Sequence, residues 1–559
     1  MENPQEIKTR KEINFNFDKI LSVFGEEKID LNIQNDSETT VVQATLKEHL
    51  ERLKAQRKTY SDISSFGKNG EKLQWVHFVQ EGGGTLGISL VGYAFILEFV
   101  GIRFLKLAGT SAGAINTLFL AAIGEKDDPK TPELYDMLTD SDRFDMRGFI
   151  DAKNSIVRKL ILSLSKGYGL IKNILLRYVV LLGAIMLPLP LLSHIGKVWF
   201  IVYGVLLGLF VVASFYAAYL FYRFNKYNFG INPGIKFQEF LEKELQTFGV
   251  ETQKDLDEKA KGKTEFQFNP DSNFRSKNSA NSEPDATADL VQEVQVKQPA
   301  ENQQETKKKS KLTLYLNVDN KLEGNQLPDE YGEISWDYSF VATDINNETK
   351  VVLPLDGKLY FENQSDINPS NYVRASMAIP IFFEPQFFPE KPQKNDPGKN
   401  IPDHLKNLWE EIKGRPTYKV REKGILIDGG SLSNFPINLF HNPKISGKEP
   451  RMPIMGVRIM DEDPEEKIPI TKKMSFTGFA GKIINTLRNN EDNSFLAINP
   501  FYKKYSIADI SAYETKVNWL NFGLNEEEQK ALFLVGIKAA LNYLENFDWE
   551  TYKKERSKI

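Results

Sequence analysis

The sequence predicts an α/β domain that is assembled from separate stretches of the chain. Apolar strands at 75–79 and 102–108 each lead into a glycine-rich turn and a helical pattern. Farther along, an apolar strand at 424–427 ends in an aspartate and two glycines. Neither the first stretch, with its two strands, nor the later one has enough elements to bury a core alone. We therefore expect the two stretches to join in one domain with insertions. The predicted parts of this domain are residues 72–170, 227–250 and 312–559.

The composition allows a sizeable core and excludes some classes of function. The chain has 559 residues, of which 41% are hydrophobic, and its formal net charge is −4. Such a balance lacks the basic excess expected of a nucleic-acid-binding protein. Cysteine is absent, so disulfides, thiol nucleophiles and thiolate metal sites are excluded. The acidic triplet 461–463 lacks the spacing of a calcium loop, and we expect neither a metal nor a cofactor.

Residues 1–71 are predicted to be an N-terminal extension without a cleaved signal peptide, because the chain starts without an apolar stretch. Within it, residues 45–58 predict an amphipathic helix that packs on the domain through Leu46, Leu50 and Leu53. A similar spacing of apolar residues predicts a C-terminal packing helix over 525–544.

Residues 171–226 predict a transmembrane hairpin of two helices. Tyr178–Leu192 and Val198–Tyr222 are uncharged runs separated by five residues, in a chain whose mean hydropathy is −0.38. Lysine and arginine flank the pair on both sides, which predicts a multi-pass membrane protein with its catalytic domain in the cytoplasm. The alternatives are a buried core hairpin and a re-entrant segment at the membrane surface.

Residues 251–311 are rich in Gln, Asn, Glu, Lys and Ser and contain few large apolar side chains. Such a stretch cannot offset the entropy lost on ordering, so we expect a flexible low-complexity linker. An alternating pattern at Leu312–Val318 predicts that a strand follows it.

The first glycine-marked site is Glu81–Gly87, directly after the strand at 75–79. Gly82, Gly83 and Gly84 let backbone N–H groups approach an anion without a Cβ in the way. With Gly87 the loop also matches the dinucleotide pattern G-x-G-x-x-G. That alternative is weak, because no acidic residue ends the next strand.

The second site is Gly109-Thr-Ser111-Ala-Gly113, placed between a strand and a helix. In this G-x-S-x-G context the turn is sharp, Gly109 and Gly113 make room for it, and Ser111 is exposed as a nucleophile. The alternative is a tight strand-to-helix turn in which the serine caps the helix.

The third site is Asp428-Gly429-Gly430, followed by Ser431–Pro436. An aspartate at the end of a strand lies where α/β sheets build their sites, and it can face a nucleophile on a neighbouring strand. Alone, it would be interpreted as an Asp-Gly turn.

No histidine has a convincing position as the base. Of the five histidines, only His441 follows Asp428, as the Ser-Asp-His order of α/β-hydrolases requires, and it lies in a polar loop. A dyad in which Asp428 takes the proton of Ser111 directly is more economical. Glycine N–H groups of Gly83 and Gly84 would then stabilise the oxyanion.

The order of these three motifs resembles the patatin-like phospholipases. Further stretches agree with this resemblance, namely Gly230–Phe237, Phe340–Asp344 and Arg374–Pro380. The resemblance implies a three-layer α/β/α sandwich and a Ser–Asp dyad that hydrolyses lipid acyl esters. It implies Ser111 as nucleophile, Asp428 as base and Gly82–Gly84 as oxyanion loop. One departure is Leu86, where the family usually has a basic residue.

We therefore expect a membrane-anchored serine hydrolase that releases fatty acid from phospholipids or other glycerolipids in the bilayer that holds it. Two alternatives remain open. One is a non-catalytic lipid-binding scaffold on the same fold, which Leu86 motivates. The other is an acyltransferase that uses the same acyl-enzyme.

Overall fold

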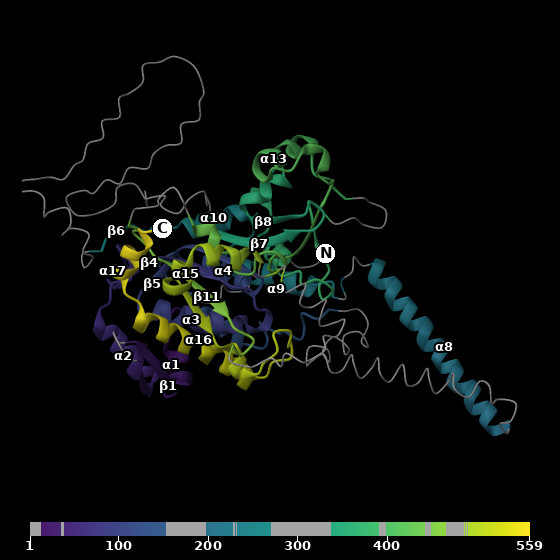
Figure 1. The fold of residues 1–559 in the computed structure, drawn as a ribbon, viewed down its shortest axis with the longest axis horizontal. Coiled ribbons are helices and arrows are strands. Elements are labelled where there is room, and N and C mark those ends of the chain that lie inside the picture. Colours follow the sequence, from purple (N-terminus) through teal and green to yellow (C-terminus); the bar gives the residue numbers. More distant parts are fainter. Residues whose placement is uncertain are drawn as a thin grey trace, which may run out of the picture.

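The structure is a computed structural model that describes residues 13–34, 39–151, 197–226, 230, 232–269, 337–390, 398–441, 449–464, 486, 488 and 490–559. Helices surround a central mixed sheet (Figure 1), as the predicted α/β class requires. The strands are β1 (Lys28–Gln34), β2 (Thr39–Thr45), β3 (Ile63–Phe66), β4 (Lys72–Gln80), β5 (Ile102–Thr110), β6 (Gln267–Phe268), β7 (Tyr338–Asp344), β8 (Thr349–Leu353), β9 (Gln386–Phe388), β10 (Gly424–Asp428), β11 (Ile454–Ile459) and β12 (Ile507–Ile510).

The central sheet joins strands from all parts of the described chain in the order β12-β11-β4-β5-β7-β10-β9, with β3, β6 and β8 at its sides. The pairs from β12 to β7 are parallel, whereas β10 runs antiparallel to β7 and β9. The core strands β4, β5 and β7 are buried along almost their whole length. Burial of nearly every residue of a strand is typical of strands that are covered on both faces of the sheet.

Strand β7 brings the ends of β5 and β10 together. Thr110 at the end of β5 pairs with Val341, and Asp428 at the end of β10 pairs with the next residue, Ala342. Because β8 occupies the other edge of β7 along the same residues, β5 and β10 follow one another along a single edge. The register alone therefore places the residue after Thr110 beside Asp428.

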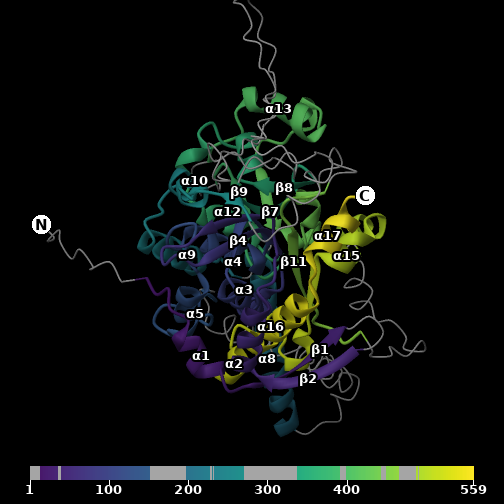
Figure 2. The same ribbon diagram turned by 90° about the vertical axis from the view of Figure 1, so that its left-hand side faces the viewer.

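The larger helices of the domain are α3 (Ile88–Phe99), α4 (Ala112–Ala122), α5 (Thr131–Thr139), α9 (Ile235–Thr247), α10 (Gln253–Lys261), α12 (Ser370–Ser376), α13 (Asp403–Lys413), α15 (Pro500–Tyr505), α16 (Glu526–Asn546) and α17 (Trp549–Arg556). Helix α16 confirms the predicted C-terminal packing helix, and it packs along α3 (Figure 2). Gly92 and Gly536 make this approach possible, since a Cβ on either would lie closer than 3.0 Å to backbone of the partner helix.

The N-terminal residues are integrated into the domain more closely than the boundary at residue 71 predicts. Helix α1 spans Asp18–Phe24, and the predicted amphipathic helix is α2 (Leu46–Gln56) with Leu46, Leu50 and Leu53 buried. Strand β3 pairs with β4, so the sheet already begins at Ile63. The boundary at residue 71 is therefore wrong. Strand β3 is too short to give an alternating pattern in the sequence, so the pattern does not reveal it.

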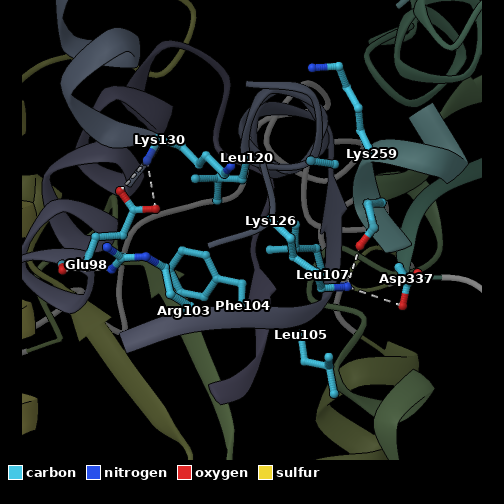
Figure 3. A pocket seen from close by; sticks show the side chains of 12 residues that line it. Glu98, Arg103, Phe104, Leu105, Leu107, Leu120, Lys126, Lys130, Lys259 and Asp337 are labelled. Atoms are coloured by element: carbon cyan, nitrogen blue, oxygen red, sulfur yellow. Dashed lines mark hydrogen bonds and ion pairs between the residues drawn. The ribbon is translucent and has the colours of Figure 1, made fainter. Parts of the chain in front are cut away.

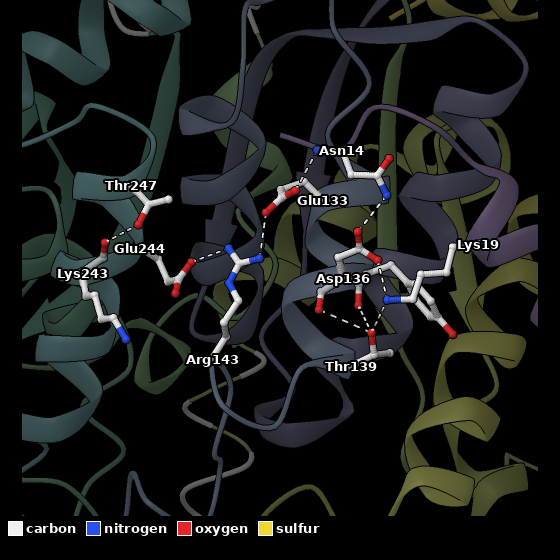
Figure 4. A network of polar contacts seen from close by, with 10 residues as sticks. Asn14, Lys19, Glu133, Asp136, Thr139, Arg143, Lys243, Glu244 and Thr247 are labelled. Carbon is white, nitrogen blue, oxygen red and sulfur yellow. Dashed lines mark hydrogen bonds and ion pairs between the residues drawn. The ribbon is translucent and has the colours of Figure 1, made fainter. Parts of the chain in front are cut away.

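A polar network ties the first described residues to two helices (Figure 4). Arg143 forms ion pairs with Glu133 of α5 at 2.8 Å and with Glu244 of α9 at 2.6 Å. The second oxygen of Glu133 accepts a hydrogen bond from the backbone N–H of Asn14 at 2.9 Å. Both carboxylates are buried, so Arg143 compensates charges that would otherwise be costly.

The predicted start of the linker at residue 251 is also wrong. Helix α10 follows at once, and β6 then pairs with β3. Thr252 and Asp255 form a capping box, and Leu256 is buried under the helix. This helix is short and lies at the start of a stretch that is polar on average, so composition alone does not reveal it. The remainder of the linker and the strand predicted at Leu312–Val318 lie outside the described residues.

The second half of the predicted hairpin is helix α8 (Lys197–Lys226), which projects away from the domain in Figure 1. Several of its apolar side chains are exposed, including Val212 and Phe215. Residues 152–196, which contain the first half, lie outside the described residues. Within the part of the chain that the structure describes, no helix combines the length and the apolar character that crossing a membrane requires.

Candidate active site

Ser111 lies in a strained turn between β5 and α4, as the pentapeptide predicts. Its backbone has φ 53° and ψ −119°, in a region that residues with a side chain rarely adopt. Such strain is kept where the surrounding structure imposes it, often at functional sites. Gly109 and Gly113 allow the turn, since a Cβ on either would lie closer than 3.0 Å to backbone atoms.

Ser111 and Asp428 are in direct contact although 317 positions separate them in the chain. The Ser111 hydroxyl donates a hydrogen bond to Asp428 Oδ2 at 2.6 Å, while Asp428 Oδ1 accepts one from the Gly430 N–H at 2.7 Å. A Cβ on Gly429 or Gly430 would collide with its surroundings, so both glycines are needed for close packing here. The two residues that the sequence selects thus meet at one point.

Burial raises the pKa of Asp428 above its ordinary value, while the hydrogen bonds from Ser111 and Gly430 and the charge of Arg488 act in the opposite direction. A carboxylate with a raised pKa is a better proton acceptor, and general bases are often tuned in this way. The contact can therefore transfer the proton of the Ser111 hydroxyl to Asp428.

Two residues of the segment Arg374–Pro380 contact Ser111, and the sequence did not assign either a role. The Ser111 N–H donates to Ser376 Oγ at 2.9 Å, and Ser376 donates in turn to the Val341 carbonyl at 2.6 Å. Met377 Sδ lies 3.2 Å from Ser111 Oγ. Ser376 thus connects the strained turn to β7, and Met377 covers the hydroxyl.

The glycine loop lies against Ser111. A Cβ on Gly82 would be 2.9 Å from Ser111 Cβ, so only glycine permits this approach. Gly84 has φ +56°, and Gly87 lies against Ala112, where a Cβ would also collide. Gly82 and Gly87 therefore let the two ends of the loop lie against the turn that carries Ser111 and against the start of α4.

Leu86, the departure from the usual pattern, is a buried core residue with 1% of its surface exposed. A cation nevertheless reaches the loop, because Arg488 Nη2 donates to the Gly82 carbonyl at 3.3 Å. No local pattern in the sequence marks Arg488, which becomes visible only in three dimensions.

The loop is also held by Asn434 and Glu81. Asn434 Nδ2 donates to Gly82 O at 2.9 Å and to Glu81 Oε1 at 3.0 Å, and Glu81 Oε2 accepts from the Ile459 N–H at 2.6 Å. Burial raises the pKa of Glu81 to about 7 against the effect of these donors and of Arg458 and Arg488.

The described histidines have other partners. His441 Nδ1 lies 3.0 Å from the Tyr502 hydroxyl, His49 Nε2 lies 2.9 Å from the Ile29 carbonyl, and the His77 ring stacks on Phe440. His404 is exposed on the surface, and His194 lies outside the described residues. Among the residues that the structure covers, no group of three His, Asp or Glu side chains could hold a metal ion.

An apolar cavity of about 720 Å³ adjoins Ser111. Gly84, Ala112 and Met377 line it beside the serine, and side chains of α3, α4, α5 and α9 and of the connecting segments line the rest. Almost every other lining residue is aliphatic or aromatic, including Val91, Phe119, Leu134, Met137, Leu138, Phe144, Phe149, Phe237 and Phe522. A lining of this apolar character suits apolar ligands.

A second cavity, of about 350 Å³, lies beside β5 and contains neither Ser111 nor Asp428 (Figure 3). Its lysines bond to the backbone, Lys126 to the Ala260 carbonyl and Lys130 to the Glu125 carbonyl. Burial lowers the pKa of Lys130 to about 7. Lys259 points away from the other charged groups in Figure 3, so the cations do not converge on one position.

Comparison with known proteins identifies a family. A family model described as "Patatin-like phospholipase" matches residues 78–441. The uncharacterized protein YqhO of Bacillus subtilis (strain 168) is 26% identical over 211 residues, which is 37% of this chain and 57% of that protein. The chain thus spans 57% of the length of this curated relative. A crystal structure of VipD from Legionella pneumophila aligns with a TM-score of 0.30 and 13% identity, covering 89% of this chain and 72% of VipD.

Proposed function

The chain belongs to the patatin-like phospholipase family, and we propose that it is a serine hydrolase that releases fatty acid from glycerolipids through a Ser111–Asp428 dyad. The observation that carries this proposal is the 2.6 Å hydrogen bond from the Ser111 hydroxyl to the buried Asp428 carboxylate, next to Ala112 and Met377, which line an apolar cavity.

The reaction begins when Ser111 Oγ attacks the ester carbonyl of the lipid and its proton passes to Asp428 Oδ2. The negative charge on the former carbonyl oxygen is stabilised by N–H groups of the Gly82–Gly84 loop, each worth about 3 kcal/mol at the transition state. The ester C–O bond then breaks, and the leaving alcohol takes the proton from Asp428. The acyl group remains on Ser111.

Water completes the cycle. Asp428, again ionised, takes a proton from a water molecule as its oxygen attacks the acyl-enzyme. The bond to Ser111 Oγ breaks, the serine recovers its proton from Asp428, and the fatty acid leaves. The apolar cavity next to Ala112 and Met377 suits the acyl chain, since its walls offer almost no polar partner.

We further propose that residues 171–226 hold the enzyme at a membrane, with the domain on the cytoplasmic side. The support is the uncharged run Val198–Tyr222, the basic residues on both flanks, and the exposed apolar side chains of α8. The wild-type protein should stay with the membrane fraction during carbonate extraction. Changing Val212 and Phe215 to Glu should allow carbonate to extract a large part of the protein. Unchanged retention of this variant would contradict the anchor.

The activity is tested with purified protein on mixed lipids. Ser111→Ala and Asp428→Asn should each abolish fatty acid release and labelling by a fluorophosphonate probe. Ser506→Ala is a matched control, because Ser506 is also buried but bonds to Tyr552 far from the cavity. Undiminished release by both dyad variants would overturn the proposal.

The same assay separates the alternatives. Wild-type protein that neither labels nor hydrolyses would be a lipid-binding scaffold. Protein that labels at Ser111 but passes its acyl group to an added lysolipid in preference to water would be an acyltransferase.

A further inference from the structure

The carbonyl of Gly82 receives hydrogen bonds from two side chains that are distant in sequence. Asn434 Nδ2 donates to it at 2.9 Å and Arg488 Nη2 at 3.3 Å. The Gly82 N–H donates in return to the Asn434 carbonyl at 3.0 Å. An amide and a guanidinium together hold this one carbonyl in place.

The Gly82 carbonyl belongs to the same peptide group as the Gly83 N–H. Because a trans peptide is planar, its C=O and N–H bonds point in opposite directions. Donors that fix the oxygen therefore also fix the direction of the N–H. They polarise the group as well, which makes the N–H a stronger donor.

This peptide lies beside the proposed nucleophile. A Cβ on Gly82 would come within 2.9 Å of Ser111 Cβ, so the loop backbone and the serine are in close contact. The Gly83 N–H is one of the donors expected to stabilise the oxyanion. Because Asn434 and Arg488 hold the oxygen of this peptide group, they also set the direction of the Gly83 N–H on its other side.

Arg488 adds a positive charge as well as a hydrogen bond. It is partly buried, with its guanidinium 6.0 Å from the centre of the Trp519 ring. The positive charge of Arg488 lowers the pKa of Asp428, whereas burial raises it. The same charge also lowers the pKa of Glu81. Glu81 also faces Arg458, Asn434 and the Ile459 N–H.

We propose that Arg488 is a positioning residue that acts, together with Asn434, on the Gly82–Gly83 peptide. Its donation to the Gly82 carbonyl aims the Gly83 N–H at the oxyanion that forms on the substrate. This inference rests on the proposed function, since it requires attack of Ser111 on an acyl carbonyl. Such a residue stabilises the transition state more than the bound substrate.

The experiment compares Arg488→Gln and Arg488→Lys with the wild type in steady-state hydrolysis of a phospholipid. Removing an oxyanion donor outright costs about 10²–10³ in kcat, and here the donor remains but loses its orientation. Arg488→Gln should therefore lower kcat by roughly 10- to 100-fold with KM within about twofold. Arg488→Lys keeps the charge and should recover part of kcat.

The pH profile gives a readout that a merely structural role would not move. Activity needs ionised Asp428, and Arg488 lowers the pKa of that carboxyl. Loss of the charge in Arg488→Gln should shift the acid limb of kcat to higher pH, whereas Arg488→Lys should leave it in place. Arg458→Gln is the matched control, because Arg458 is also close to Glu81 but pairs with Asp509 at 2.9 Å. It should leave kcat unchanged.

The outcomes separate this inference from the proposed function. Wild-type kcat and an unmoved acid limb in Arg488→Gln, while Ser111→Ala is inactive, would overturn the inference alone. An equal loss of kcat in Arg458→Gln would also overturn it. Full activity of Ser111→Ala would overturn both. If Arg488→Gln does not fold, Arg488→Lys decides: full kcat in the lysine variant, which lacks the guanidinium that bonds to the Gly82 carbonyl, would exclude the positioning role.

Discussion

Replacing Asp428 by Asn should inactivate the protein without destabilising it. Each carboxylate oxygen of Asp428 accepts one hydrogen bond: Oδ2 accepts from the Ser111 hydroxyl and Oδ1 from the Gly430 N–H. An amide has only one acceptor. If its oxygen keeps Gly430, its NH₂ group faces Ser111 Oγ, which must then accept a hydrogen bond with the lone pair that should attack. The variant thus lacks the base, and its amide group binds the lone pair with which Ser111 Oγ would attack.

The size of the effect on the rate follows from the role of the base. Positioned general bases contribute about 10²–10⁴-fold, and the reversed hydrogen bond adds to that loss. We expect kcat to fall by about 10³-fold or more, which corresponds to roughly 4 kcal/mol in the activation free energy. Labelling by a fluorophosphonate should fall in parallel, since it needs the same activated oxygen.

The effect on stability should have the opposite sign. Burial raises the pKa of Asp428, so the folded protein holds this proton more tightly than the unfolded chain does. As pH rises above the unfolded value near 3.8, ionisation of Asp428 therefore costs folding stability. Asn carries no charge, so the variant should equal or exceed the wild type in Tm at pH 7.5 and lose that advantage toward pH 4.

Activity and thermal unfolding of the same preparations test this reasoning. A variant that keeps more than about a tenth of the wild-type rate would show that Asp428 is not the base. A variant that loses activity together with several degrees of Tm at pH 7.5 would show that the carboxylate serves the structure instead.

Three further predictions address the turn, the loop and the cavity. Ser111→Gly should be more stable than Ser111→Ala by about 1 kcal/mol in urea unfolding, because only glycine relieves the strain at φ 53°; equal stabilities would mean that the turn is unstrained. The pKa of Glu81 is raised to about 7 from 4.5, so wild-type stability should fall between pH 4.5 and 7 by up to about 3 kcal/mol. Glu81→Gln should flatten this dependence, and a wild type as stable at pH 8 as at pH 5 would argue against a buried titrating Glu81. Leu138→Trp narrows the cavity and should lower kcat/KM for long-chain esters about 10-fold or more relative to short-chain esters, whereas an unchanged ratio would place the acyl chain elsewhere.

The sequence predicted the parts of the site that depend on local chemistry. The turn around Ser111 and the loop Gly82–Gly84 each follow a strand and precede a helix, and their conformations need glycines at fixed positions. Asp428 was selected because it ends a strand with two glycines behind it. Local constraints of this kind leave a pattern in a single sequence.

The remaining parts could not be predicted, because their contacts span hundreds of residues. Ser376 reaches the N–H of Ser111 across 265 positions, and Arg488 reaches Gly82 across 406. A serine in a short helix and an arginine in a polar stretch carry no local mark of such partners. Asn434 lay within the third motif, but its contact with Glu81 depends on how the loop folds back on β4.

The arrangement around β7 explains how an aspartate can take the place of a histidine in the proposed dyad. An intervening imidazole would require Asp428 to stand farther from the serine, as in a Ser-His-Asp triad. Because β5 and β10 end at neighbouring residues of the same edge, the carboxylate instead lies at hydrogen-bond distance from Ser111. A carboxylate in water would be a weak base for a hydroxyl, so the short contact must be combined with burial, which raises the pKa of Asp428. In the proposed mechanism, Met377 and the glycine loop, which lie against Ser111, therefore affect the strength of the base as well as the shape of the site.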